Sequence, residues 1–299
     1  MNAPVLLLAA LLGTPVVGVA HGAPAAAPTE ASRDTVSPEM SRDTVVSVQR
    51  GDVLVSETLR GTLTVRSGGD DEVRLSGDRD GEVRLVREGR NVRLQGLRGQ
   101  PDVDLVLELP AWMPLRIRSR EMDLSVTGLS AEVVVGVLQG DVRLEDLDGP
   151  VEARTVDGEV DARSTRGSMI LNTNDGDVRV SGHRGELRVE STDGDLVLRD
   201  VMGPSISAFT LDGDVDFDGV VEGNGSLELS THDGDVVAWV PGDVRADVEV
   251  STFDGGFESE FPARTRGFRA GEPLRFQIGG GGARIALRSF SGDISIHSR

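Results

Sequence analysis

Acidic residues recur beside glycine at regular places along the chain, and aligned carboxylates could hold a metal ion or a basic partner. Six Thr/Ser-x-Asp-Gly motifs carry their aspartates at Asp157, Asp175, Asp193, Asp212, Asp233 and Asp254. In all but the last motif a second acid follows the glycine, at Glu159, Asp177, Asp195, Asp214 and Asp235. If the motifs repeat one structural unit, both rows of acids line up along one edge, which we call the acidic corner.

Carboxylates stacked at the strand spacing of ~4.8 Å repel one another by on the order of 1 kcal/mol per pair even in water. Calcium prefers several carboxylate and carbonyl oxygens and could offset this repulsion, and the six aspartates are then its candidate ligands. The spacing is similar to that of the calcium-binding nonapeptide roll. However, that motif is GGxGxDxUx, whereas each turn here has a single glycine.

Ordinary turn chemistry explains the same residues without a metal. Each Asp would accept hydrogen bonds from backbone N–H groups of its own turn, and the Thr or Ser two residues earlier would do likewise. The glycine would adopt the positive φ that a corner requires. We favour this interpretation and keep two alternatives, a calcium-stabilised repeat and a metal-free edge that recognises a partner.

The sequence contains no arrangement typical of a catalytic site, such as HExxH, GxSxG or a phosphate loop. We expect the four histidines, His21, His183, His232 and His297, to be solvated residues and not bases or ligands. Paired carboxylates could cleave glycans, but similar acids recur in every repeat, whereas an active site makes one repeat different. We therefore predict no enzyme activity and no catalytic or cofactor-binding residue, with a polysaccharide-active β-helix enzyme as the alternative.

Arg50-Gly51-Asp52 matches the integrin-binding triplet. Three residues match easily by chance in a chain with 38 Gly and 50 acidic residues. Because a short motif needs structural context before it supports a function, we assign this one none.

The composition limits the class of protein and its partners. With 38 Gly and only 3% aromatic residues among 299, the chain suits a thin, repetitive β architecture better than one large core. A net charge of −19 disfavours binding to nucleic acid or to an anionic membrane surface. Because the chain has no Cys, packing and hydrogen bonds must stabilise the fold without disulfides.

Glycine recurs every nine residues from Gly140 to Gly203, and apolar residues alternate after most of these glycines, as at Val142 and Leu144. This pattern predicts short strands separated by turns. Corners of the Thr-x-Asp-Gly type alternate with a second kind, such as Arg166-Gly167, so the period is eighteen. Because two short strands cannot bury an apolar face alone, copies should stack. We predict an all-β fold, a parallel β-solenoid (β-helix or two-sided β-roll) with about 18 residues per coil.

Stacking in this register makes residues eighteen apart neighbours on adjacent coils. The outward columns Arg143–Asp161–Arg179 and Arg154–Asn172–Glu190 alternate or dilute their charges, which supports the register. The acidic corner does not alternate in sign, so its charge needs a separate explanation.

The remaining segments surround the repeats. Residues 1–20 lack charged side chains and end in small residues, which indicates a secretory signal peptide. An uncleaved anchor is the alternative, because no Lys or Arg precedes the apolar run. Residues 21–43 predict a disordered tether. Residues 44–120 alternate apolar and polar residues unevenly, so we expect an irregular β region that caps the N-terminal end. Residues 121–299 hold the solenoid repeats, with an insertion near 256–288 that could cap the other end. No second apolar run is long enough to span a membrane.

Three stretches carry a resemblance to a known family: VDLVLELPAWMPLRIRSREMDLSVTGL, the repeated DGDV-type coils, and IGGGGARIALRSFSGDISI. Over about residues 45–299 the chain resembles a bacterial family of exported β-strand-repeat proteins of unknown function, of the putative-adhesin type. The resemblance implies a β-repeat domain and assigns no catalytic residue. A shared fold says little about function.

Together these observations predict an exported, non-enzymatic β-solenoid in the periplasm, on the outer surface or outside the cell. It would serve as a binding, adhesion or scaffold module. We expect its partner to be an envelope protein or a glycan, not nucleic acid. After removal of the leader, we expect no membrane span and no cofactor other than the calcium considered above.

Overall fold

The computed structural model of the chain describes residues 44–299 except 58, 79–82, 97–101 and 263–272. The predicted signal peptide and tether lie outside the described residues. Only the unit Ser41–Arg299 is considered further. Its 23 described strands join in one hydrogen-bonded sheet, and no helix occurs among them, which confirms the predicted all-β class. In this described part, no helix is long and apolar enough to cross a membrane.

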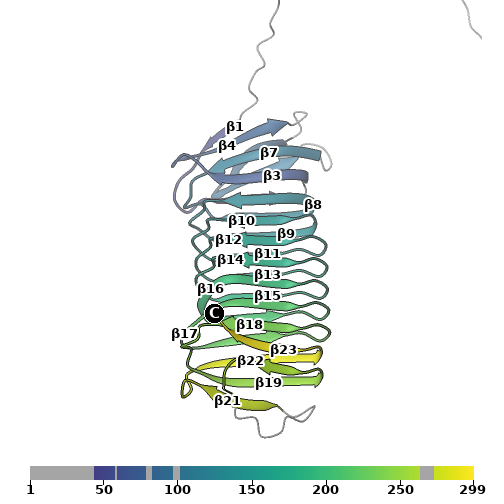
Figure 1. Cartoon of the computed structure of the whole chain (residues 1–299). Helices are drawn as coiled ribbons and strands as arrows, with labels where there is room; N and C mark the ends of the chain where they lie inside the picture. Colours follow the sequence, from purple (N-terminus) through teal and green to yellow (C-terminus); the bar gives the residue numbers. More distant parts are fainter. Residues whose placement is uncertain (1–43, 58, 79–82, 97–101, 263–272) are drawn as a thin grey trace, which may run out of the picture. The chain divides into compact units, whose positions relative to one another are not determined.

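The central strands form two parallel stacks that face each other across the core (Figure 1). The first face contains β10 (Val142–Glu145), β12 (Val160–Arg163) and β14 (Val178–Ser181), and the second contains β9 (Val133–Gln139), β11 (Val151–Arg154), β13 (Met169–Asn172) and β15 (Leu187–Glu190). β8 (Leu115–Thr127) is long enough to contribute to both faces, since its two ends pair with β9 and β10.

Adjacent strands on each face are offset by eighteen residues, as the sequence predicts. Val142 lies opposite Val160 on the first face, and Val151 lies opposite Met169 on the second. The predicted outward columns are confirmed too, because Asp161 pairs in register with both Arg143 and Arg179. We call each pair of strands with its two corners a coil.

Short apolar side chains fill the space between the two faces. Within each central strand, buried and solvent-facing residues alternate, and Val160, Ala162 and Leu171 are fully buried. Each fully buried Val or Leu contributes about 1.5–3 kcal/mol relative to an exposed one. Because one coil buries only a few such residues, stability depends on the stacking of many coils.

Beyond β15 the strands lengthen and the spacing loosens. β16 (Leu196–Phe209) and β17 (Val215–Ser230) each run from the first face to the second, so their second corner contains extended strand in place of a tight turn. β17 pairs with β16 over most of its length, with register shifts between Leu198 and Val201 and between Gly203 and Ser205. Corner aspartates therefore follow one another at 19 and 21 residues here, as Asp193–Asp212 and Asp212–Asp233 show.

The last coil of the chain is not the last coil of the stack. After β18 (Val236–Val240), the chain forms β19 (Ala246–Asp254) and β20 (Phe257–Ser259), and then β21 (Leu274–Ile278), which pairs antiparallel with β19. It returns as β22 (Ala283–Ser291) and β23 (Ile294–Ser298). β22 pairs with β17 on one side and β19 on the other, while β23 lies between β18 and β20 (Figure 1). The C-terminal coil is thus inserted between two coils that precede it in sequence.

The N-terminal strands show a related exchange of order. They are β1 (Thr44–Ser47), β2 (Val53–Glu57), β3 (Arg60–Ser67), β4 (Glu72–Asp78), β5 (Val83–Glu88), β6 (Asn91–Gly96) and β7 (Asp102–Leu109). β2 and β3 pair in parallel with β8, and β6 and β7 stack on their far sides. β4 and β5 add antiparallel pairs to β7 and β6. The domain boundaries drawn from the sequence stay predictions.

Candidate functional site

The acidic corner is a continuous ladder of short bridges between coils. Asp157, Asp175, Asp193, Asp212 and Asp233 are joined in that order by parallel bridges. The next neighbour of Asp233 is Ser291, and Asp254 pairs with Ser291 from the other side. The six aspartates therefore lie along one edge but are not all consecutive, because the C-terminal coil brings Ser291 between Asp233 and Asp254.

The corner glycines have the predicted positive φ. Gly158 and Gly194 have φ values of 147° and 139°. A Cβ atom at Gly194 would also lie 2.4 Å from the carbonyl oxygen of Gly176, the glycine one coil earlier. These positions require glycine for two reasons: the backbone has a positive φ, and the backbone of the adjacent coil leaves no space for a Cβ atom.

The hydroxyl groups of the motif face inward and act as donors, not as the acceptors that turn chemistry predicts. The Thr or Ser that begins each of the six Thr/Ser-x-Asp-Gly motifs is buried. Thr231 Oγ1 donates to the Gly213 carbonyl at 2.9 Å and to the Asp233 carbonyl at 3.2 Å. Most of these hydroxyls therefore satisfy carbonyl groups at the corner from inside the coil.

The acid after the glycine, not the acid before it, accepts the backbone hydrogen bonds. Asp177 Oδ1 accepts from the N–H of Asp195 at 3.0 Å, and Asp195 Oδ1 accepts from the N–H of Asp214 at 2.9 Å. The same bond recurs from Asp235 to Asp214 at 2.8 Å and from Asp293 to Asp235 at 2.7 Å. Each carboxylate thus ties its coil to the next, and we call this row the bonded acids. Its acidity has a structural cause, because a carboxylate strengthens the bond.

Glu159 interrupts the row of bonded acids. Its own N–H donates to Asp141 Oδ1 at 3.1 Å, but its longer side chain turns outward to Arg179, at 3.0 Å from Nη1. Among the described residues, no carboxylate therefore accepts from the backbone N–H of Asp177. The exception supports a requirement for the length of an Asp side chain at this position.

The aspartates before the glycines, which we call the outer acids, project into solvent. Asp175, Asp193, Asp212 and Asp233 are exposed, and in the part of the chain that the structure describes their carboxylates make no hydrogen bond or ion pair. Asp157 accepts only a long bond of 3.4 Å from Gln139 Nε2. No three acidic or histidine side chains among the described residues come together as a metal site. The fold does not neutralise this row of charge.

A row of exposed side chains that we did not single out from the sequence runs beside the outer acids. The variable residue of Thr-x-Asp-Gly supplies Leu211, His232 and Phe253, and Phe290 joins them from the inserted coil. His232 and Phe290 stack with ring centroids 4.7 Å apart, and Phe290 and Phe253 stack at 4.9 Å with planes 5° apart. Phe253 and Phe290 are 59% and 47% exposed. We call Leu211, His232, Phe290 and Phe253 the aromatic row.

The signal for the aromatic row was present in the sequence, at the residue between Thr or Ser and Asp. Its order was not, because Phe290 lies between His232 and Phe253 only through the insertion of β22 and β23. Exposed aromatic side chains on a chain with 3% aromatic residues are a selective use of a scarce residue type. Such contiguous apolar surface is typical of interaction sites.

The opposite corner contains a buried histidine. His183 is fully buried, so the expectation that it is solvated is wrong. Its Nδ1 lies 2.9 Å from Thr165 Oγ1, and its Nε2 lies 3.3 Å from the Glu186 carbonyl. Because a carbonyl only accepts, Nε2 carries the hydrogen and Nδ1 accepts from Thr165. Burial lowers the pKa of His183, and the positive charge of Arg184 adds to this effect.

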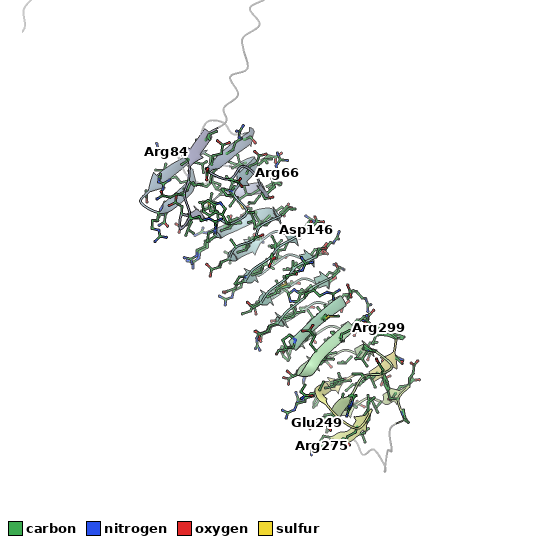
Figure 2. All side chains as sticks on the ribbon, turned by 90° about the vertical axis from the view of Figure 1, so that its left-hand side faces the viewer. Arg66, Arg84, Asp146, Glu249, Arg275 and Arg299 are labelled. Atoms are coloured by element: carbon green, nitrogen blue, oxygen red, sulfur yellow. The ribbon has the colours of Figure 1, made fainter. Side chains whose placement is uncertain are left out.

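Charged side chains on the two broad faces are largely paired, unlike the outer acids. Figure 2 shows them projecting from successive strands. Arg163 and Asp161 approach to 2.5 Å, and Arg154 and Glu152 to 2.7 Å. Because these pairs are exposed, each contributes little to stability. They do, however, leave the acidic corner as a strip with little local compensation.

The Arg50-Gly51-Asp52 triplet is not available as an adhesion motif. Asp52 is fully buried, and its Oδ2 accepts from Arg87 Nη2 at 2.7 Å and from the Gln49 N–H at 2.9 Å. A receptor that reads an exposed aspartate could not reach this carboxylate. The assignment of the triplet to chance agrees with this geometry.

Part of the chain is similar to a known protein family. Residues 167–297 match the family described as Toastrack DUF4097. This segment, less than half of the chain, includes the aromatic row and most of the acidic corner. The resemblance inferred from the sequence, to a bacterial domain of unknown function and putative-adhesin type, is thus confirmed. No match to the chain was found among curated proteins.

Two solved structures align with most of the chain. One is a putative cell adhesion protein from Clostridium sporogenes, with 11% identity, a TM-score of 0.25, and coverage of 86% of this chain and 99% of that one. The other is a putative adhesin from Parabacteroides merdae, with 9% identity, a TM-score of 0.38, and coverage of 85% and 95%. At these identities and scores, the alignments add no evidence about function.

Proposed function

We propose that the chain carries a β-solenoid that acts as a non-enzymatic binding, adhesion or scaffold module of the cell envelope. The eighteen-residue parallel pairing of the central coils supports the solenoid description. A stack of coils offers a long contact surface without a catalytic group.

One observation carries the proposal: the unpaired outer acids and the exposed aromatic row lie side by side along one edge. A row of carboxylates without counter-charges favours a partner that brings positive charge. Aromatic side chains beside them offer apolar contact area at little entropic cost. We therefore infer that the partner is an envelope protein segment that combines Arg or Lys with apolar side chains.

Binding to arrays of short peptides with Arg or Lys alternating with Phe or Leu tests this function. Replacing the four unpaired outer acids, Asp175, Asp193, Asp212 and Asp233, by Asn should weaken binding at least tenfold, as should F253A combined with F290A. The matched control replaces four paired acids on the broad faces, Glu152, Asp161, Glu190 and Glu228, by Gln or Asn. It changes the net charge equally and should bind as the wild type does. Equal weakening in both four-residue variants would reduce the effect to net charge and overturn the proposal.

Two other functions remain as proposals. The outer acids Asp157, Asp175, Asp193, Asp212, Asp233 and Asp254 could take up calcium, since all six are exposed and, among the described residues, only Asp157 accepts a hydrogen bond, a long one from Gln139. A polysaccharide-active enzyme is the other, and a screen of envelope glycans for new reducing or unsaturated ends tests it. Most coils with a Thr/Ser-x-Asp-Gly corner present similar acids, and this regularity favours binding over catalysis.

A further inference from the structure

A hollow on the second face collects arginine side chains at the end of the stack. It has a volume of about 640 Å³ and lies over β19, β21 and β22. Arg275, Arg284 and Arg288 line it together with Asp247 and Glu249, so its lining has one more positive than negative group. The charge of this lining is therefore opposite in sign to the net charge of the chain, which is −19.

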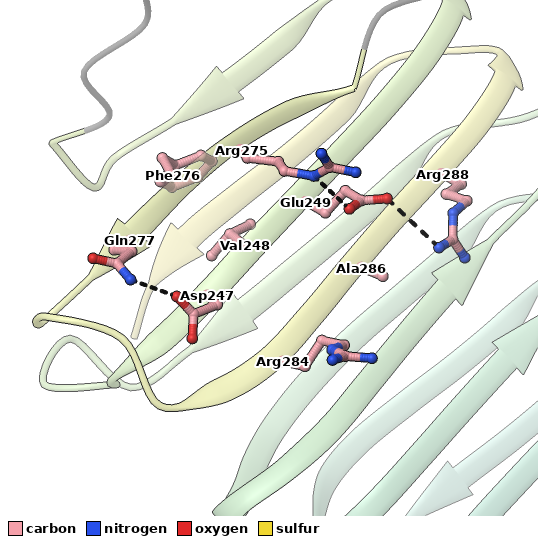
Figure 3. A pocket seen from close by; sticks show the side chains of 9 residues that line it. All are labelled: Asp247, Val248, Glu249, Arg275, Phe276, Gln277, Arg284, Ala286 and Arg288. Carbon is pink, nitrogen blue, oxygen red and sulfur yellow. Dashed lines mark hydrogen bonds and ion pairs between the residues drawn. The ribbon is translucent and has the colours of Figure 1, made fainter.

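Ala286 provides the floor of the hollow. It occupies an outward position of β22, yet it is only 6% exposed, because larger side chains surround it. Its neighbours in register are Glu228 on β17 and Glu249 on β19. Arg284 and Arg288 flank it along β22, as Figure 3 shows. A small residue among long ones leaves space for an incoming group.

Two of the three arginines are already held by the fold. Arg275 Nε contacts Glu249 Oε2 at 2.8 Å, and Arg288 contacts Glu228 and, at 3.9 Å, Glu249. The hydrogen bond from Arg275, with the nearby positive charges, lowers the pKa of the Glu249 carboxyl. These contacts hold the side chains that form the wall of the hollow, and the charges of both arginines are paired with carboxylates.

Arg284 differs from the other two. It is exposed, and among the described residues its guanidinium makes no ion pair or hydrogen bond. Asp247 lies opposite it in the strand register, but its Oδ1 accepts from Gln277 Nε2 at 2.7 Å, and Arg284 turns away from it (Figure 3). Arg284 also lines an adjoining hollow of about 510 Å³ with Asn224 and Ser226. An unused planar donor thus lies where two hollows meet.

We propose that Arg284 is the recognition residue of a site for a carboxylate-bearing sugar, a uronic acid unit of an acidic polysaccharide. A guanidinium pairs with a carboxylate through two parallel hydrogen bonds. Asp247 and Glu249 can accept hydrogen bonds from sugar hydroxyls, and Asn224, Ser226 and Gln277 can donate or accept them. The same two acids repel a doubly charged phosphate, so a single negative charge with several hydroxyls fits best. The hollow has a size typical of small-ligand sites.

Titration of the full chain with oligogalacturonate, followed by calorimetry and by the Arg Nε–H signals in NMR spectra, tests this site. Arg284→Ala should weaken binding at least tenfold, since a hydrogen-bonded charge pair is lost. Arg118→Ala is the matched control, because Arg118 is also exposed on a strand and has no partner among the described residues. It should bind as the wild type does. Melting temperatures of both variants should equal that of the wild type, which separates binding from folding.

Three further arms decide the chemistry. A carboxyl-reduced oligosaccharide of equal length should not bind, and inorganic phosphate should bind far more weakly than oligogalacturonate. The variant with four outer acids replaced by Asn should keep its affinity for oligogalacturonate, so this site and the acidic corner can fail separately. Undiminished binding by Arg284→Ala, or tighter binding of phosphate than of oligogalacturonate, would overturn the proposal.

Discussion

Asp214 Oδ1 accepts a hydrogen bond of 2.8 Å from the backbone N–H of Asp235, the equivalent residue one coil further along the stack. Residues of like charge can therefore occupy neighbouring positions, because each carboxylate accepts a hydrogen bond from the backbone N–H of the equivalent acid on the next coil. The attraction between carboxylate and N–H offsets the repulsion between the carboxylates. This explains one of the two acidic rows, whereas the outer acids receive no such compensation.

Replacing a bonded acid should therefore cost stability. Asp214→Ala removes the acceptor for the Asp235 N–H, and we expect a loss of about 1 kcal/mol in the free energy of unfolding, since the group is exposed and water partly replaces it. Asp193→Ala, in the outer row, should be neutral or slightly stabilising. Urea unfolding measures both, and an equal loss in the two variants would contradict the distinction between the rows.

Shortening Glu159 should extend the row of bonded acids. In Glu159→Asp, the carboxylate can reach the N–H of Asp177, as Asp177 reaches that of Asp195. The exposed pair with Arg179 is lost, but such pairs contribute little, and Arg179 keeps Asp177 at 2.8 Å. We expect a gain of about 0.5 kcal/mol in unfolding free energy. A stability equal to or below that of the wild type would argue against a length requirement.

Gly194→Ala should damage the fold far more than alanine at another glycine of positive φ. At Gly194, φ is 139° and a Cβ would meet the Gly176 carbonyl oxygen at 2.4 Å, so the coils must separate. At Gly223, φ is 61° and a Cβ would meet no atom within 4 Å apart from its own chain neighbours. We expect roughly 1 kcal/mol for Gly223→Ala and at least about 3 kcal/mol for Gly194→Ala. Thermal unfolding followed by circular dichroism compares them, and similar melting temperatures would contradict the close backbone contact.

His183 should make stability depend on pH. Burial lowers its pKa in the folded state below the ordinary value of 6.5, so the unfolded chain binds more protons as the pH falls below that value. Stability from this group is therefore full above pH 6.5 and falls, by up to about 1.4 kcal/mol per pH unit, until the pKa of the folded state is reached.

His183→Thr, which copies the buried Thr165 of the preceding coil, should remove this part of the slope. Unfolding free energies measured between pH 5 and pH 8 for both proteins provide the comparison. Parallel curves would show that His183 binds protons equally in the folded and unfolded states, and they would contradict this prediction.

Calcium binding at the outer acids predicts a higher melting temperature in millimolar calcium than in chelator. The increase should disappear when all six outer acids are replaced by Asn, since no carboxylate then remains at those positions. The same six-residue variant should gain some stability without calcium, because the repulsion along the row is removed. Identical melting curves of the wild type with calcium and with chelator would eliminate the calcium proposal.

Local regularities determined much of this fold in advance. The alternation of apolar residues and the eighteen-residue spacing fixed the strands, their register and the glycine corners, since each depends on residues close in sequence. The columns Arg143–Asp161–Arg179 followed directly from that spacing. The six outer acids were also found, because their motif repeats with little change.

Only the tertiary structure decided how the ends of the stack are ordered and which side chains meet there. The eighteen-residue spacing loosens after Asp193, and after Val240 sequence order no longer fixes spatial order. β22 and β23 pair on both sides with strands that precede them. That insertion separates Asp233 from Asp254, completes the aromatic row with Phe290 and forms the hollow around Arg284. Which backbone N–H a carboxylate binds and whether His183 is buried also depend on the neighbouring coil. The sequence of a single repeat does not contain that information.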